Sequence, residues 1–267
     1  MPISEKIVVG TSGYSYYDWK GVFYPADIKS SEMLAFYCTK FNGLEINSSF
    51  YKLHIYRFYK NLDEKTPDYF QFIVKIFRDI THKRREIDEA LRKSKQAVEP
   101  LIAKGKFGGF LAQFPPSFSF SQINLDYIKN VKEALVDLPL FIEFRNPSWC
   151  REETYISFQK SDISYVCVDG PKLPELMPRQ DIVTTKFAYM RFHGRNKEAW
   201  MKPPMGKKYN YNYSYEELIE CKDKIKKMLD KCNKIFIFFN NGINGYAPKN
   251  ALQLMEMLGL KSESCCN

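Results

Sequence analysis

Charged and amide side chains stand at the ends of several apolar runs of this sequence. In the run LFIEFR at residues 140–145, the alternation of a β-strand places Glu143 and Arg145 on one face and Ile142 and Phe144 on the other. Other apolar runs end in the same way, with Glu45 and Asn47, Lys75, Gln113, Asp169, and Arg191 and His193 at their ends. Strands whose last inward residues are polar indicate one shared site at one end of one barrel.

Three of these residues are carboxylic acids, Glu45, Glu143 and Asp169, and they are the first catalytic candidates. Two carboxyl groups about 5 Å apart suit a nucleophile and an acid, and a gap of roughly 6.5–9.5 Å leaves room for a water molecule. Three acids could instead hold a metal ion, or pair with Arg145 and Arg191 to balance buried charge. Converging acids repel one another, so we expect Glu143→Gln to leave the melting temperature level or to raise it.

His193 is the fourth catalytic candidate. It lies two residues after Arg191, so both side chains point the same way in a regular strand. With an ordinary pKa near ~6.5, His193 could act as an acid, a base or a metal ligand, and a purely structural histidine is the alternative. We predict no cofactor. A divalent metal on these donors and His82 is the less favoured alternative, because the chain has few histidines and no cysteine cluster.

A second group of residues suits the binding of a polar or anionic substrate. Arg145, Arg191 and Lys75 supply cations at strand ends, where arginine offers a fork for carboxylate or phosphate. The turn at Thr11 and Ser12 can present backbone N–H groups to the same anion. Neutral hydrogen-bonding groups come from Asn47, Gln113, Asn240 and Asn241. The alternative is that the cations only neutralise the acids.

The segment 195–213 interleaves lysines and arginine with aromatic residues, among them Trp200. Above a barrel mouth, such a segment could be a lid or a stacking platform for bases or sugars, with Trp200 as a substrate-binding residue. The alternative is a surface loop whose tyrosines pack on the neighbouring helix.

The elements that must position these residues alternate along the chain. Strands are predicted at residues 7–13, 43–49, 70–76, 108–114, 140–145, 164–169, 187–194 and 235–241. Helices are predicted at 30–41, 54–62, 84–104, 122–136, 152–160, 214–231 and 248–258, the sixth with a capping box formed by Ser214 and Glu217. This order predicts a single α/β domain over residues 1–267, a TIM-like (β/α)8 barrel of parallel strands, with residues 261–267 as a frayed tail.

Composition agrees with one large α/β domain. The chain has 267 residues, close to the ~250 typical of an eight-stranded α/β barrel. Its seven cysteines include no CxxC pair, which argues against a zinc knuckle or a disulfide framework. No apolar run approaches the ~20 residues of a membrane span and the first ten residues lack a signal-peptide pattern, so we expect a cytoplasmic protein with no membrane partner.

The motifs of the chain resemble those of the YecE-like family, also called the domain-of-unknown-function 72 family. The matching pieces are GTSGY (10–14), Trp19, FYP (23–25), FNGLEINSSFY (41–51), TP (66–67), FIVK (72–75), ITH (80–82), QFPPSF (113–118), IEFR (142–145), SW (148–149), RFHG (191–194), YNYSYEE (211–217), FFNN (238–241) and NA (250–251). They span nearly the whole chain in the order of the family. The resemblance implies a TIM-like barrel and names no reaction.

The residues therefore favour an enzyme that acts on a polar, anionic small molecule at the carboxyl ends of the strands. Hydrolysis of a phosphoester or glycosidic bond is the first expectation, and sugar isomerisation or lyase chemistry is the second. The alternative from another class is a non-catalytic nucleic-acid-binding protein, because the net charge of +9 and the basic, aromatic segment 195–213 both suit a polyanion. The sequence makes no prediction about oligomeric state.

Overall fold

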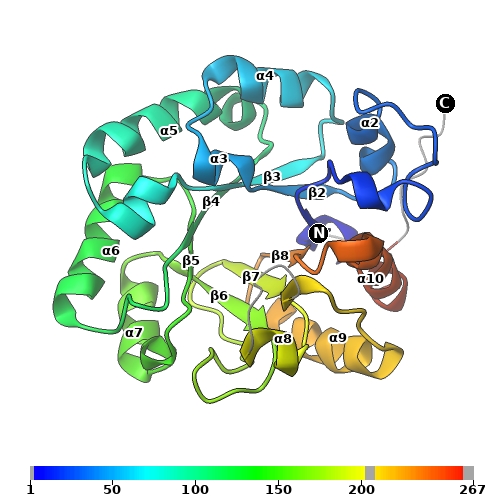
Figure 1. Ribbon diagram of the computed structural model, residues 1–267. Helices are drawn as coiled ribbons and strands as arrows, with labels where there is room; N and C mark the ends of the chain where they lie inside the picture. Colours follow the sequence, from blue (N-terminus) through cyan, green and yellow to red (C-terminus); the bar gives the residue numbers. More distant parts are fainter. Residues whose placement is uncertain (1–2, 202–207, 261–267) are drawn as a thin grey trace.

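Eight parallel strands close into a barrel in the order in which they occur along the chain (Figure 1). The computed structural model describes residues 3–201 and 208–260. The strands are β1 (Ile7–Ser12), β2 (Gly43–Ile46), β3 (Gln71–Lys75), β4 (Phe107–Gln113), β5 (Leu140–Glu143), β6 (Ser164–Asp169), β7 (Phe187–Phe192) and β8 (Lys234–Phe239). The predicted (β/α)8 barrel is thus confirmed. The predicted tail at 261–267 lies outside the described residues.

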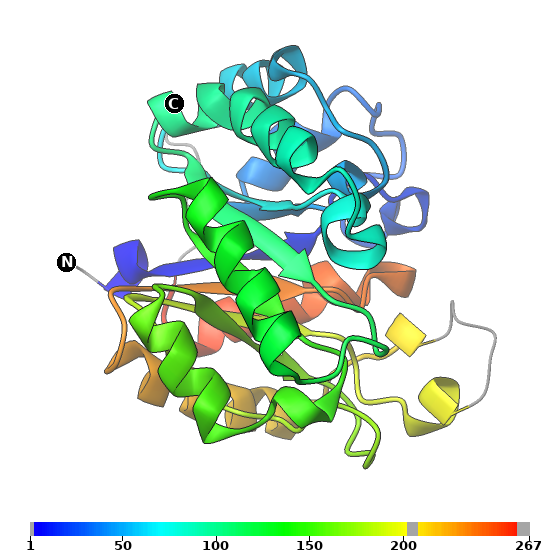
Figure 2. The same cartoon turned by 90° about the vertical axis from the view of Figure 1, so that its left-hand side faces the viewer.

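Helices cover the outside of the barrel (Figures 1 and 2). They are α1 (Ile3–Lys6), α2 (Met33–Cys38), α3 (Ser48–Tyr51), α4 (Tyr56–Glu64), α5 (Ile87–Ala103), α6 (Gln122–Leu135), α7 (Glu152–Lys160), α8 (Lys197–Met201), α9 (Tyr215–Leu229) and α10 (Tyr246–Met257). The predicted capping box is present, since Ser214 Oγ accepts from Glu217 N and Glu217 accepts from Ser214 N. No helix among the described residues is long and apolar enough to cross a membrane.

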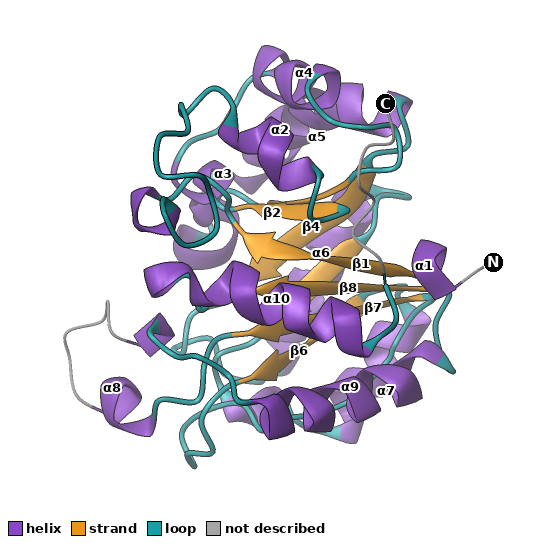
Figure 3. Cartoon of the chain, turned by 90° about the vertical axis from the view of Figure 1, so that its right-hand side faces the viewer, coloured by secondary structure: helices purple, strands orange, loops and turns teal. Residues whose placement is uncertain are grey.

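All strands except β6 end one to three residues before the predicted end, and two of these differences affect the candidate site. β2 stops at Ile46 because the following residues turn into α3, and β5 stops at Glu143, so that Arg145 follows the strand. The carboxyl ends of the strands lie at the end of the barrel where α3 and α8 are found, opposite α1 (Figure 3). In barrels of this class, the carboxyl end is the one that carries active sites.

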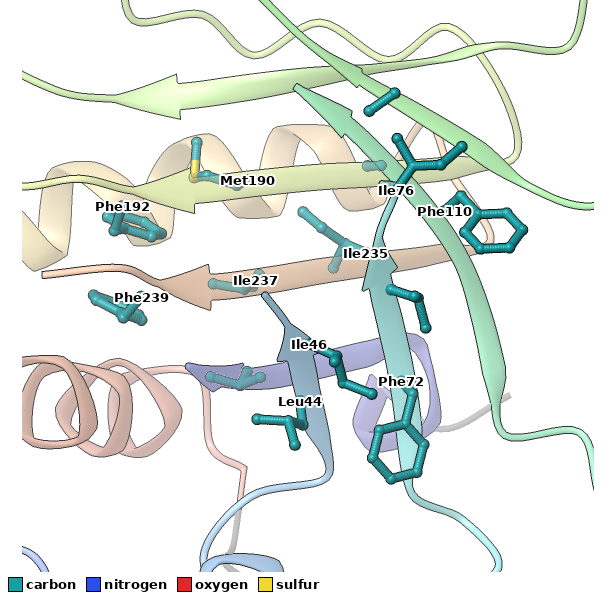
Figure 4. Close-up of a cluster of buried hydrophobic side chains, with 14 of the residues drawn as sticks. Leu44, Ile46, Phe72, Ile76, Phe110, Met190, Phe192, Ile235, Ile237 and Phe239 are labelled. Atoms are coloured by element: carbon teal, nitrogen blue, oxygen red, sulfur yellow. The ribbon is translucent and has the colours of Figure 1, made fainter. Parts of the chain in front are cut away.

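Two apolar layers support that end. The larger one lies between the strands and the helices, and includes Leu44, Ile46, Phe72, Met190, Ile237 and Phe239 (Figure 4). The smaller one fills the barrel interior and consists of Val8, Ile73, Leu111, Phe141, Val166, Tyr189, Phe236 and Phe238, with Phe187 against it. Because side chains alternate along a strand, the next inward residue after Phe141 is Glu143 and the next after Tyr189 is Arg191. The interior layer is therefore the floor beneath the polar residues.

β1 and β2 approach each other closely through two glycines. Gly10 pairs with Gly43, and the Tyr37 hydroxyl accepts from Thr11 N at 2.8 Å and donates to Gly43 O at 3.1 Å. A Cβ at residue 10 would overlap the Gly43 carbonyl oxygen and lie 2.8 Å from Tyr37 Oη. This approach leaves no room for a side chain at Gly10.

We therefore expect Gly10→Ala to lower the free energy of unfolding by roughly 1–3 kcal/mol or more, because the added methyl group meets backbone rather than a flexible side chain. Gly170→Ala is the matched control, since a Cβ there would have no atom within 4 Å. Chemical denaturation of both variants measures the effect, and equal stability of the two would contradict the close approach of β1 and β2.

Candidate active site

A buried arginine bridges two buried glutamates above the floor. Arg191 on β7 donates from Nε to Glu45 Oε2 at 2.8 Å and from Nη2 to Glu45 Oε1 at 2.6 Å, a two-point contact with β2. Its Nη1 donates to Glu143 Oε2 on β5. Glu45 and Glu143 are both 0% exposed, and Arg191 is 1% exposed. One guanidinium thus joins three strands that are distant in the sequence.

Neighbouring residues complete the environment of Glu45. The Tyr189 hydroxyl, one inward position before Arg191, donates to Glu45 Oε2. Asn47 Nδ2 donates to Glu45 Oε1 at 3.0 Å, and Ser12 Oγ lies 3.5 Å from Arg191 Nη2. Ser12 is the register partner of Glu45, so both side chains enter the interior side by side. Both oxygens of Glu45 are therefore occupied by donors.

Glu143 is in contact with a second arginine and with the histidine. Arg145 Nε lies 2.8 Å from Glu143 Oε1, and His193 Nε2 lies 3.3 Å from the same oxygen. The Arg145 Nη2 is 3.2 Å from His193 Nε2, and Asn240 Nδ2 is 3.1 Å from His193 Nδ1. A proton on Nε2 faces the Glu143 carboxylate and leaves Nδ1 to accept from Asn240, whereas a proton on Nδ1 leaves Nε2 to accept from Arg145.

The charges of this cluster hold both glutamates ionised. Burial alone would raise the pKa of Glu143, but the charges of Arg145 and Arg191 outweigh it and hold that pKa well below its usual value. The same balance, with Arg191 dominant among the lowering contacts, lowers the pKa of Glu45. Burial and the charge of Arg145 lower the pKa of His193 to about 4, so its imidazole is neutral at pH 7.

Lys75 has a different environment at the end of β3. Its Nζ donates to Gln113 Oε1 at 3.0 Å and lies 4.4 Å from the centre of the Phe50 ring. Among the described residues, no carboxylate oxygen lies within 4.0 Å of this amine. Burial and the charge of Arg191 lower the pKa of Lys75 to about 8. Of the cations in this cluster, Lys75 is the one that titrates near neutral pH.

The segment after β7 places aromatic residues over these polar groups. The Arg145 guanidinium lies 5.8 Å from the centre of the Trp200 ring, and Lys208 Nζ lies 5.0 Å from that ring. The Tyr209 ring is 5.8 Å from the His193 ring. Two buried polar atoms here, Trp200 Nε1 and Asn47 Oδ1, have no hydrogen-bond partner among the described residues. The rest of the predicted lid, residues 202–207, lies outside the described residues.

The structure brings together most of the residues that the sequence singled out. The ones joined by the contacts above are Ser12, Glu45, Asn47, Lys75, Gln113, Glu143, Arg145, Arg191, His193, Trp200 and Asn240. Three other candidates, Thr11, Asp169 and Asn241, lie on the outer side of the barrel wall.

Asp169 was assigned to the wrong face of its strand. Val168 is the register partner of Arg191, whereas Asp169 is paired with the outward Phe192. The Asp169 carboxylate receives Arg195 Nε and Nη2, each at 2.7 Å, and the Tyr213 hydroxyl at 2.9 Å. These contacts of Asp169 hold the start of the 195–213 segment against α9. Asp169 contacts neither Glu45 nor Glu143.

Thr11 and Asn241 also form their hydrogen bonds on the outer side of the barrel wall. Thr11 Oγ1 donates to Gly13 O at 2.6 Å, and its backbone N–H donates to Tyr37. Asn241 Nδ2 donates to Tyr211 O at 2.8 Å and to Asn250 Oδ1 at 2.9 Å. Both side chains stabilise the ends of strands, and the prediction that they bind substrate is not carried further.

Sequence reasoning missed two residues of the site. Tyr189 could have been found, because it stands two positions before Arg191 and so shares its face. Phe50 could not, because it reaches Lys75 from α3, outside the strands. Among the described residues, no group of three or more histidine, cysteine, aspartate or glutamate side chains is arranged to hold a metal ion. The space between Glu45 and Glu143 holds the Arg191 guanidinium.

The fold and the polar cluster define a TIM-barrel protein with its candidate site at the carboxyl ends of the strands. The chain belongs to the family described as protein of unknown function DUF72, whose model matches residues 8–267. The YecE-like family is the same family.

Relatives of the chain agree in length and fold. The UPF0759 protein YunF of Bacillus subtilis is 33% identical over 276 residues, which cover 96% of this chain and 95% of YunF. A DUF72 family protein of Thermotoga maritima has a crystal structure with a TM-score of 0.87 and 38% identity, covering 95% of this chain and 99% of that one. A DUF72 family protein of Enterococcus faecalis has a TM-score of 0.87 and 25% identity, covering 96% of each chain.

The pairing of Glu143 changes the expectation for its removal. Mutual repulsion of acids was the reason to expect a stable Glu143→Gln variant, but each carboxylate faces a guanidinium. Replacing Glu143 leaves Arg191 and Arg145 with one carboxylate between them. We expect Glu143→Gln to lower the free energy of unfolding by roughly 3–5 kcal/mol at pH 7, the usual cost of leaving a buried charge unpaired.

Because the folded-state pKa of Glu143 lies below its usual 4.5, its contribution is present above that pH and is lost as the pH falls. The stability gap between the wild type and Glu143→Gln should therefore narrow below about pH 4.5. Glu64→Gln is the control, since Glu64 is exposed and its contact with Lys60 contributes little. If the stability difference between the wild type and Glu143→Gln stays the same at acid pH, Glu143 stabilises the fold through packing and not through its charge.

Proposed function

We propose that this protein is an enzyme that binds a small anionic substrate at the mouth of the barrel, and that Lys75 is its reacting group. The reaction class that suits an amine base or nucleophile is carbonyl chemistry, as in isomerases and lyases. The observation that carries the proposal is the amine of Lys75, which has no carboxylate partner among the described residues and has a pKa lowered to about 8.

The state of the two glutamates argues against the hydrolysis that the sequence favoured. A glycosidase pair needs one carboxyl group that is protonated near neutral pH, and such a group has a raised pKa. The pKa values of Glu45 and Glu143 are both lowered, and the Arg191 guanidinium lies between them. Neither glutamate is therefore suited to donate a proton at pH 7, and their proposed role is to hold Arg191 and Arg145 in place.

Several groups of the polar cluster suit an anionic, oxygen-rich ligand. Arg145 is the arginine of the cluster that reaches solvent, with 13% of its side chain exposed. Trp200 Nε1, near Arg145, is a donor and Asn47 Oδ1 is an acceptor, and neither atom has a partner within the described part of the chain. Polar atoms that are buried without a partner cost free energy, and a bound ligand that hydrogen-bonds to them removes this cost.

The nucleic-acid-binding alternative relied on the basic, aromatic segment 195–213. Two aromatic residues of that segment face the mouth, since Trp200 lies against Arg145 and Tyr209 against His193. Tyr211 and Tyr213 instead donate to Glu217 and Asp169 on the outer side. This arrangement favours a lid over a small ligand above an open stacking platform for a polynucleotide. Salt-dependent binding of DNA without turnover would favour the alternative instead.

The proposal predicts that anion binding depends on the charge of Lys75. Sulfate is a suitable probe, because its charge is constant across the pH range used. The charges facing Lys75 are Arg191, Arg145, Glu143 and Glu45, and its own charge lowers the pKa of His82. Lys75 loses its proton as the pH rises through about 8. Sulfate affinity, measured by calorimetry, should fall about tenfold between about pH 7 and about pH 9.

Two variants separate this effect from general surface charge. Lys75→Gln should bind sulfate weakly at every pH in this range, and Lys60→Gln, which removes an exposed lysine, should behave as the wild type. Sulfate binding by Lys75→Gln with the affinity and the pH profile of the wild type would place the anion site elsewhere.

A further inference from the structure

Lys75 differs from the other buried cations of the protein in what it contacts. Arg191 and Arg145 are paired with Glu45 and Glu143, and Lys106 Nζ lies 2.8 Å from Asp63 Oδ1. Lys75 instead contacts a neutral amide oxygen and the face of the Phe50 ring. A lysine that only balances buried charge would be expected beside a carboxylate.

The surrounding structure holds the Lys75 amine in one position, as a reacting group requires. Lys75 is the last residue of β3, so its backbone is held by the sheet, and its Nζ is oriented by the Gln113 contact of 3.0 Å. Arginine charges nearby and partial burial both favour the neutral amine. With a pKa of about 8, about one amine in ten is neutral at pH 7, against about one in three thousand at the ordinary value of 10.5.

We propose that Lys75 is a nucleophile that forms an imine with an aldehyde or ketone carrying a carboxylate or phosphate group. This inference rests on the proposed function and names its substrate class. The Nζ lone pair attacks the carbonyl carbon, the C–N bond forms as the C=O π bond breaks, and a proton moves from the nitrogen to the oxygen to give a carbinolamine. The hydroxyl group then takes a second proton from solvent and leaves as water, while the nitrogen lone pair forms the C=N bond of the protonated imine. Addition of water reverses both steps, so no oxidant or reductant is consumed.

Imine formation gives a chemical reason for the position of Lys75 near the arginines. A protonated imine withdraws electrons from the neighbouring carbon, which loses a proton or a carbon substituent more readily than in the free carbonyl compound. The anionic group of the substrate would lie against Arg145, beneath Trp200. We assign the exchange of a proton to His82, because its ring lies 5.0 Å from Phe50 and because burial, together with the Lys75 charge, lowers its pKa.

Trapping with sodium cyanoborohydride tests the proposal, because it reduces an imine to a stable amine. The probes are glyoxylate and dihydroxyacetone phosphate, which carry a carboxylate and a phosphate, with acetaldehyde as the uncharged comparison. After reaction at about pH 8, peptide mass mapping should find Lys75 labelled roughly tenfold more than any exposed lysine, because a larger fraction of its amine is neutral. Excess sulfate should suppress this label, and acetaldehyde should label Lys75 less than either anionic probe.

Lys75→Arg keeps the cation but forms no stable imine of this kind, and it should lose the selective label while still binding sulfate. Lys60→Arg should keep the label. Label spread evenly over surface lysines, or label at Lys75 that sulfate does not suppress, would overturn the proposal. If sulfate binding depends on Lys75 and no probe labels it, the imine is refuted and the proposed anion site stands. If Lys75 affects neither sulfate binding nor labelling, both proposals fail.

Discussion

The contact on which the rest of this site depends is the guanidinium of Arg191 held between Glu45 and Glu143. A buried ion is tolerated only when partners satisfy its charge and its donors, and Arg191 reaches carboxylates on two other strands. The carboxylates come from β2 and β5, and the guanidinium comes from β7. The three strands must therefore have their final stagger before the charges can pair, so this contact favours the native register over alternatives.

The charge balance of the cluster determines what the mouth can bind. Glu45 and Glu143 neutralise Arg191 and Arg145, and neutral His193 adds no charge. Lys75 is then the charge without a counter-ion among the described residues, and an anionic ligand would restore the balance. Because the glutamates are paired with the arginines, the Lys75 amine has no carboxylate partner among the described residues. This unpaired positive charge favours an anionic ligand.

The sequence predicted the barrel well because strand alternation and strand number are local properties. It also predicted the inward direction of Glu45, Glu143 and Arg191, since each has apolar neighbours on the other face. It failed at Asp169 because β6 has apolar residues on both faces, Val166 and Val168 inward and Cys167 outward, so that the pattern does not indicate the face. Which charges pair depends on the stagger between strands, and no single strand contains that information.

The site contains a fully buried, paired group of charges and, apart from it, polar groups with fewer protein contacts, and this difference is the basis of the proposed reaction. Glu45, Glu143 and Arg191 are fully enclosed, and their donors and acceptors are used within the protein. Asn47 Oδ1 and Trp200 Nε1 have no hydrogen-bond partner in the part of the chain that the structure describes, and the Lys75 amine contacts a neutral amide. Enzymes place reacting groups where the surrounding structure fixes them but leaves their bonds unmade. By that criterion, our proposal assigns the two glutamates to the support of the site and the amine of Lys75 to the reaction.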